Sequence, residues 1–98
     1  MAQQTEEVLS FEERAAGLDT EIQASIKNAE EFKTRAEAAE GTFARILLRR
    51  SEDAGLVAIG KTHDLARLVI DREAEGQDPG PWRDRATGLL DGMQSGFM

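Results

Sequence analysis

The stretch that decides the fold is residues 8–46, which read VLSFEER AAGLDTE IQASIKN AEEFKTR AEAAEGT FARI. Written in sevens, the segment has an apolar residue at almost every first and fourth position. Eleven of these twelve positions are apolar, against six of the 27 positions between them. Apolar residues that recur every 3.5 residues line one side of a helix and are typical of coiled coils. The sequence therefore predicts an all-α protein whose N-terminal half is a long coiled-coil-type helix.

The repeat ends near Arg50, and the residues after it predict two further helices. Ser51 and the two acidic residues that follow it fit an N-cap with an acidic first turn. Gly41 lies inside the repeat without interrupting its register, so the first helix is expected over residues 6–50. A second, antiparallel helix is expected over residues 52–75. Its buried face is expected to consist of Leu56, Ile59, His63, Ala66 and Ile70, widened by Leu65, Leu68 and Val69.

A Pro/Gly breaker, GQDPGP, occupies residues 76–81 and separates the second helix from a short third one. Pro81 suits the first position of a helix, so the third helix is expected over residues 81–94. The whole chain, residues 1–98, is expected to form a single helical domain.

Composition narrows the class of protein further. Apolar residues are 40% and charged residues 32% of the chain, which is typical of amphipathic helices and too apolar for a disordered chain. There is no cysteine, which excludes disulfides and is compatible with the reducing cytoplasm, where we expect the protein. The net charge of -7 repels phosphate backbones, so nucleic acid is not an expected partner. No apolar run approaches the roughly 18 residues that span a bilayer, so a membrane is not expected either.

The predicted first helix is too long for the rest of the chain to cover. It would extend about 65 Å, and the second helix reaches along only about half of it. If four large apolar side chains stay exposed, the protein loses roughly 6–12 kcal/mol of the free energy that their burial would contribute. This loss is comparable to the stability of a whole domain. A second copy or another helical protein is therefore expected to complete a helical bundle formed by oligomerisation. A monomer would instead need the helix to fold back at Gly17 or Gly41. The expected interface residues are Val8, Phe11, Ala15, Leu18, Ile22, Ala29 and Phe32.

A different class of function rests on residues 55–62, GLVAIGKT, which match the phosphate-binding pattern G-x-x-x-x-G-K-[ST]. A P-loop follows a buried strand, and the residues before Gly55 do not form one. Leu56 and Val57 also favour burial over an open phosphate loop. We expect the match to be accidental and keep nucleotide binding as the alternative function. A secreted or virion helical component is a further alternative.

No catalytic, cofactor-binding or metal-binding residue can be assigned from the sequence. The only histidine, His63, falls on the apolar face expected for the second helix, and no carboxylate shares that face at ligand spacing. Without Cys, Tyr or a second His, acid-base catalysis would need a carboxylate pair, and the acids here occupy solvated helix positions. The protein is therefore expected not to be an enzyme.

Four residues are candidates for binding a partner. Three arginines lie close together at a predicted helix end. Their positive charges stabilise the negative end of the helix dipole, and they could also bind an acidic partner. The single tryptophan opens the third helix, where such a residue either pins the helix to the core or anchors a binding surface. The four candidates are Arg45, Arg49, Arg50 and Trp82. The sequence predicts a non-enzymatic helical oligomerisation or protein–protein interaction module: an adaptor, a co-chaperone or a structural subunit.

Overall fold

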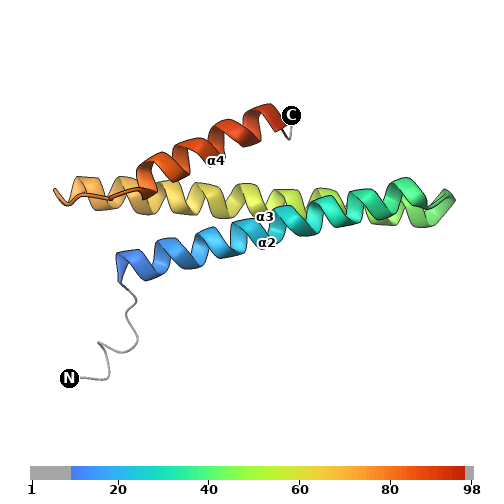
Figure 1. Ribbon diagram of the computed structural model, residues 1–98, viewed down its shortest axis with the longest axis horizontal. Helices are drawn as coiled ribbons and strands as arrows, with labels where there is room; N and C mark the ends of the chain where they lie inside the picture. The colour runs from blue at the N-terminus through green and yellow to red at the C-terminus, as the bar shows by residue number, and fades with distance from the viewer. Residues whose placement is uncertain (1–9, 97–98) are drawn as a thin grey trace, which may run out of the picture.

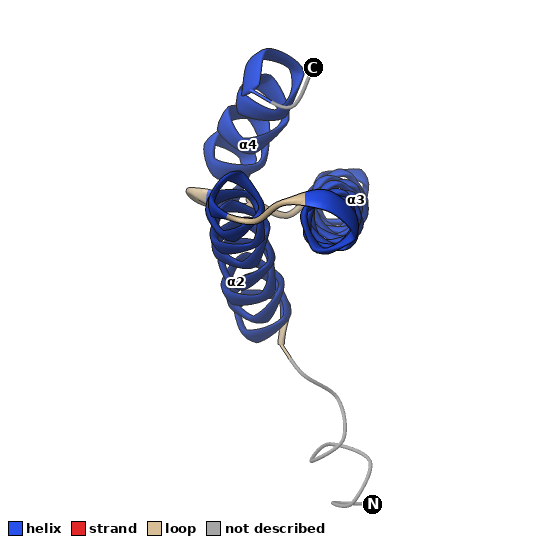
Figure 2. Cartoon of the chain, turned by 90° about the vertical axis from the view of Figure 1, so that its right-hand side faces the viewer, coloured by secondary structure: helices blue, strands red, loops and turns tan. Residues whose placement is uncertain are grey.

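The computed structural model describes residues 10–96, and three helices account for most of them. Helix α2 spans Phe11–Ala38, α3 spans Gly41–Ala74 and α4 spans Trp82–Gly96, and no strand occurs within residues 10–96. Helices α2 and α3 run antiparallel as a hairpin, and α4 lies over one half of α3 (Figure 1). In the view along the hairpin, α2 and α4 lie one above the other with α3 beside both (Figure 2). The predicted all-α class is confirmed, and residues 10–96 contain three helices, which is the predicted number.

Helix α2 begins with a capping box at Ser10. The Ser10 hydroxyl accepts a hydrogen bond from the Glu13 backbone N–H (3.1 Å), and the Glu13 carboxylate accepts one from the Ser10 N–H (3.0 Å). Both bonds satisfy backbone donors that the start of a helix otherwise leaves unpaired. The helix therefore starts at Phe11 and not at residue 6, and residues 6–9 lie outside the described residues.

The prediction of one helix through residues 6–50 is wrong, because the chain reverses direction after Ala38. The backbone is extended at Ala39 and Glu40, and Gly41 follows with a φ of 64°. This left-handed conformation is strained for a residue with a side chain and accessible to glycine. The heptad spacing crosses the turn by coincidence, and it could not reveal the reversal.

The predicted boundary at Ser51 is also wrong, because α3 continues through it without a break. The Ser51 hydroxyl does not cap a new helix. It donates a hydrogen bond of 2.8 Å to the backbone carbonyl of Ala29 on α2. The side chain therefore joins the two arms of the hairpin. With 34 residues, α3 is long enough to lie along all of α2, which has 28.

The contact between α2 and α3 is built largely from small side chains. Buried residues of α2 recur every seven positions, at the first positions of the predicted repeat: Ala15, Ile22, Ala29 and Ala36. The buried residues of α3 are Gly55, Ala58, Thr62, Leu65 and Val69. Leu65 and Val69 belong to the predicted face, whereas the other three each lie one position before a residue predicted to be buried. Small side chains allow two helix backbones to approach closely, so the helices meet through glycine and alanine.

On the predicted α3 face, Leu56, His63 and Ile70 are exposed as a result. Thr62 takes the buried place expected for His63. Its hydroxyl donates to the Ala58 carbonyl (2.8 Å), so the one polar side chain that is buried among the described residues has a partner.

Helix α4 covers one end of the hairpin. It contributes Ala86 and Met93 to a buried cluster with α2 and α3, and Trp82 and Leu89 pack against the edge of that cluster. The cluster includes no residue of α2 beyond Ile26 and no residue of α3 before Ala58. Residues 27–57 therefore form a two-helix projection beyond this core, which we call the outer half of the hairpin (Figure 1).

Polar contacts fix α4 in place. The Trp82 indole N–H donates to Glu12 of α2 (2.8 Å), and Arg85 pairs with Asp19 of α2 (2.8 Å). Arg83 also pairs with Glu73 of α3. The connection from α3 to α4 falls at the predicted breaker, where Gly76 and Gly80 have positive φ values of 78° and 65°. Among the described residues, no helix has the length and apolar character needed to cross a bilayer.

Replacing Gly41 with alanine is expected to lower the free energy of unfolding by about 1 kcal/mol, because alanine is strained at this positive φ. The control is Gly17→Ala, inside α2, where an added Cβ meets nothing within 4 Å. That change is expected to raise the free energy of unfolding by about 0.5–1 kcal/mol. Urea denaturation followed by circular dichroism measures both. Equal stabilisation by the two alanines would contradict a turn at Gly41.

Replacing Ala86 with aspartate is expected to release α4 from the hairpin, because the charge would enter a buried contact without a partner. Trp82 lies on the same helix, so its fluorescence emission should shift to longer wavelength. The control is Thr87→Asp, at an exposed neighbouring position, which should leave the emission unchanged. An unshifted spectrum in Ala86→Asp would be evidence against docking of α4 through this face.

Candidate functional site

The residues predicted to form an oligomer interface lie mainly at contacts within the chain. Ala15, Ile22 and Ala29 are buried, whereas Phe11, Leu18 and Phe32 are partly buried. Val8 lies outside the described residues. The premise that the start of the first helix lacks an internal partner is wrong, because the turn at Gly41 brings α3 alongside it and α4 adds a third helix.

The four residues predicted to bind a partner lie in two different places. Trp82 packs against the core and its indole N–H is hydrogen-bonded to α2, so it holds α4 onto the hairpin. Arg45, Arg49 and Arg50 are exposed on the outer half of the hairpin. The structure therefore separates the tryptophan from the arginines.

The P-loop-like residues 55–62 lie in the middle of α3. Their backbone N–H groups point along a continuous helix, whereas a P-loop turns successive N–H groups toward a phosphate. The Lys61 ammonium is 2.8 Å from the Glu21 carboxylate, and this hydrogen bond raises the pKa of Lys61 above its ordinary value. Within residues 10–96, no group of three or more His, Cys, Asp or Glu side chains could hold a metal ion.

Exposed large apolar side chains concentrate on the outer half of the hairpin. Six such residues occur in the described part of the chain, and five of them fall within positions 43–57 of α3. These five are Phe43, Ile46, Leu48, Leu56 and Val57, and the sixth is Ile70. At 100° per residue, Phe43, Ile46 and Val57 lie on one side of the buried line of α3, whereas Leu48 and Leu56 lie on its other side. Apolar side chains scattered singly are normal on a protein surface, whereas several on one side of a helix mark a site of interaction.

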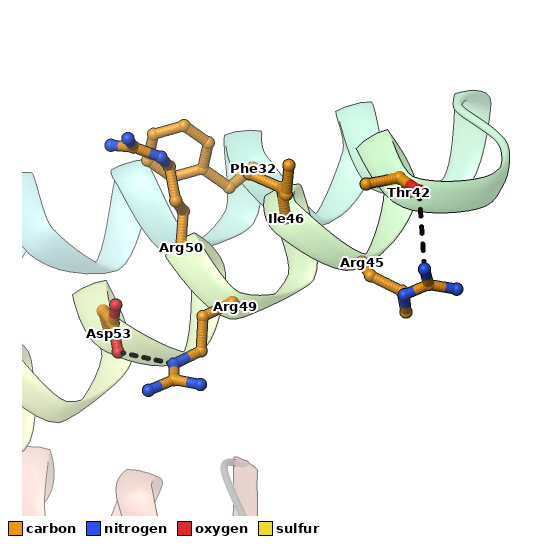
Figure 3. Close-up of a pocket in the computed structure, with 7 residues that line it drawn as sticks. All are labelled: Phe32, Thr42, Arg45, Ile46, Arg49, Arg50 and Asp53. Atoms are coloured by element: carbon orange, nitrogen blue, oxygen red, sulfur yellow. Dashed lines mark hydrogen bonds and ion pairs between the residues drawn. The ribbon is translucent and has the colours of Figure 1, made fainter.

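A shallow pocket of about 550 Å³ lies on the outer half, between α2 and α3 (Figure 3). Arg49 forms an ion pair with Asp53 (3.5 Å), and Arg45 donates to the Thr42 hydroxyl (3.4 Å). Arg50 has no ion-pair partner within the described residues. The pocket combines apolar walls with arginines and is lined by Phe32, Thr42, Arg45, Ile46, Arg49, Arg50 and Asp53.

Sequence reasoning found only part of this surface. It named the three arginines, but it placed Phe43 and Ile46 at core positions of a continuous helix and expected Leu56 to be buried. The sequence signal for the surface is Gly41, which was named as one of two possible fold-back points, because a turn there moves the later apolar residues onto a new helix.

Comparison with known proteins finds no protein-family model, no curated protein and no solved structure that matches this chain. The function is therefore argued from the chain's own surface.

Proposed function

We propose that the protein is a non-enzymatic helical protein–protein interaction module, and that the outer half of its hairpin is the docking surface. The observation that supports this proposal most is the group of exposed apolar side chains on residues 43–57. Phe43 leaves 73% of its surface exposed, and Ile46 and Val57 on the same side of α3 each leave 47%. Fully burying one side chain of this kind contributes roughly 1.5–3 kcal/mol, so a partner that covers several of them gains a substantial free energy of binding.

The composition of this surface also fits a docking site. Protein interfaces combine an apolar centre with a polar rim, and arginine is enriched in them. Here the apolar side chains are accompanied by Arg45, Arg49 and Arg50, all of which are exposed. Each arginine can hold a carboxylate of the partner while its aliphatic stem covers apolar surface.

The outer half also lacks the third helix that completes the core at the other end. Its internal contact relies on Ala29, Ala36 and Gly55, which bury little apolar area. A partner would add apolar contact at this end of the hairpin. The helical state of residues 55–62 gives the nucleotide-binding alternative no support.

A photo-crosslinking amino acid at position 43 tests the proposal in the cells that make the protein. On illumination we expect a discrete protein adduct, whether with a second copy or with another protein, because position 43 lies in the docking surface. The matched control places the same amino acid at Glu75, an exposed position at the far end of α3. A chain that forms no adduct from position 43, or the same adducts from both positions, would contradict the proposal.

A further inference from the structure

Six exposed residues of α3 form a line along the outer half of the hairpin and just beyond it. Their spacing alternates between three and four residues, as in a heptad repeat. At 100° per residue, this line lies roughly 130° around the helix from the buried line that contacts α2. We call it the outer seam, and it consists of Phe43, Ile46, Arg50, Asp53, Val57 and Gly60.

We propose that the outer seam packs against the outer seam of a second copy, with the two α3 helices antiparallel. This inference rests on the proposed function and names the partner of that surface. The seams of the two copies are complementary when the two-fold axis that relates them passes between Arg50 and Asp53. In that register Arg50 of each copy lies opposite Asp53 of the other, and Ile46 lies opposite Val57. A two-fold axis makes each contact occur twice.

The charges of the seam match this pairing. Arg50 has no ion-pair partner within the described residues, and Asp53 pairs only with the exposed Arg49 at 3.5 Å. In the dimer each Asp53 would also receive a guanidinium from the second copy. Residues 43–60 contain three basic and two acidic side chains, whereas the whole chain has a net charge of -7. The seam itself carries one arginine and one aspartate, so two copies meet there through a neutral line of residues and not through the acidic remainder of the surface.

The ends of the seam also match. Phe43 is the most exposed large apolar side chain of the described residues, and in this register its ring lies opposite Gly60 of the second copy. Gly60 lowers the stability of α3 relative to alanine, and an added Cβ there would meet nothing within 4 Å in the chain. Its internal contacts therefore do not require glycine. A glycine in this position leaves room for an aromatic ring of a partner to pack against the helix backbone.

The seam is short, which sets the expected affinity. Eighteen helical residues extend about 26 Å, and a contact of this length buries less than the area of about 1,200 Å² at which standard interfaces begin. Phe32, on the neighbouring wall of the pocket, adds apolar surface beside the seam. We therefore expect dissociation in the micromolar range.

Charge reversal at the centre of the seam tests the register. In Arg50→Asp a homodimer would place carboxylates against carboxylates, and in Asp53→Arg it would place guanidiniums against guanidiniums. Each variant alone is expected to dimerise about tenfold more weakly than the wild type. A one-to-one mixture of the two variants restores both oppositely charged pairs, so it should dimerise within about threefold of the wild type. Sedimentation velocity over a concentration series measures all four samples.

Arg50 and Asp53 are both exposed, so circular dichroism is expected to show unchanged helix content in each of the two variants. The matched control is Ile70→Asp, an exposed apolar position of α3 beyond the seam, which should dimerise like the wild type. As a second measurement, Ile46→Cys and Val57→Cys variants should form a disulfide-linked dimer when mixed, and much less of it when each is oxidised alone, because only the mixture places two cysteines opposite each other.

This inference would be overturned by a wild-type chain that stays monomeric at about 200 µM. It would also be overturned if the mixture of the two variants dimerised no more tightly than each variant alone. If the crosslinker at position 43 then captures a different protein, the proposed function stands and only the identity of the partner is wrong. If it captures nothing, both fail.

Discussion

The close approach of α2 and α3 through small side chains determines how the rest of the molecule is built. Ala15, Ala29 and Ala36 of α2 and Gly55 and Ala58 of α3 bring the two backbones together, and they bury little apolar area for each turn of helix. The largest fully buried apolar side chains are Ile22 and Leu65, and both belong to the cluster that α4 completes. A hairpin packed in this way needs a third layer to acquire a substantial core.

Helix α4 supplies that layer at one end and leaves the other end with two helices. Its indole and guanidinium groups bond to Glu12 and Asp19 of α2, so its position is fixed by polar contacts as well as by burial. In the outer half of the hairpin, α2 and α3 also meet through small side chains, but α4 does not cover them. This asymmetry explains why exposed apolar side chains concentrate at one end. It also supports the proposal that a partner docks there.

The sequence predicted the helical class and one side of the hairpin contact, because a seven-residue repeat reports which face of a helix is buried. The first positions of that repeat are the buried residues of α2. It favoured a continuous helix and gave the reversal at Gly41 only as an alternative, since Phe43 and Ile46 keep the spacing although they lie on another helix. The buried face of α3 was predicted in part, because Leu65 and Val69 were placed on it, but the pattern favoured the large residue Leu56 over Gly55. Packing between small residues overrode hydrophobicity at these positions.

The candidate site could be predicted only in part for the same reason. Arg45, Arg49 and Arg50 stood out as a basic group, but their apolar neighbours were assigned to the interior of a continuous helix. The site becomes visible only when the turn is placed correctly, because the turn decides which apolar residues of α3 face α2 and which remain exposed. The position of the chain reversal is therefore the claim on which both the fold and the proposed function depend.

Electron spin resonance can measure this reversal directly, since the chain has no cysteine and labels can be placed at will. Spin labels on Asn28→Cys and Glu52→Cys, diluted with unlabelled protein, report the distance between two exposed positions on α2 and α3. A hairpin that turns at residues 39–41 places the two labels across a single helix–helix contact, within about 20 Å of each other. A helix continuous to residue 50 would separate them by about 30 Å or more, and that distance would contradict the account.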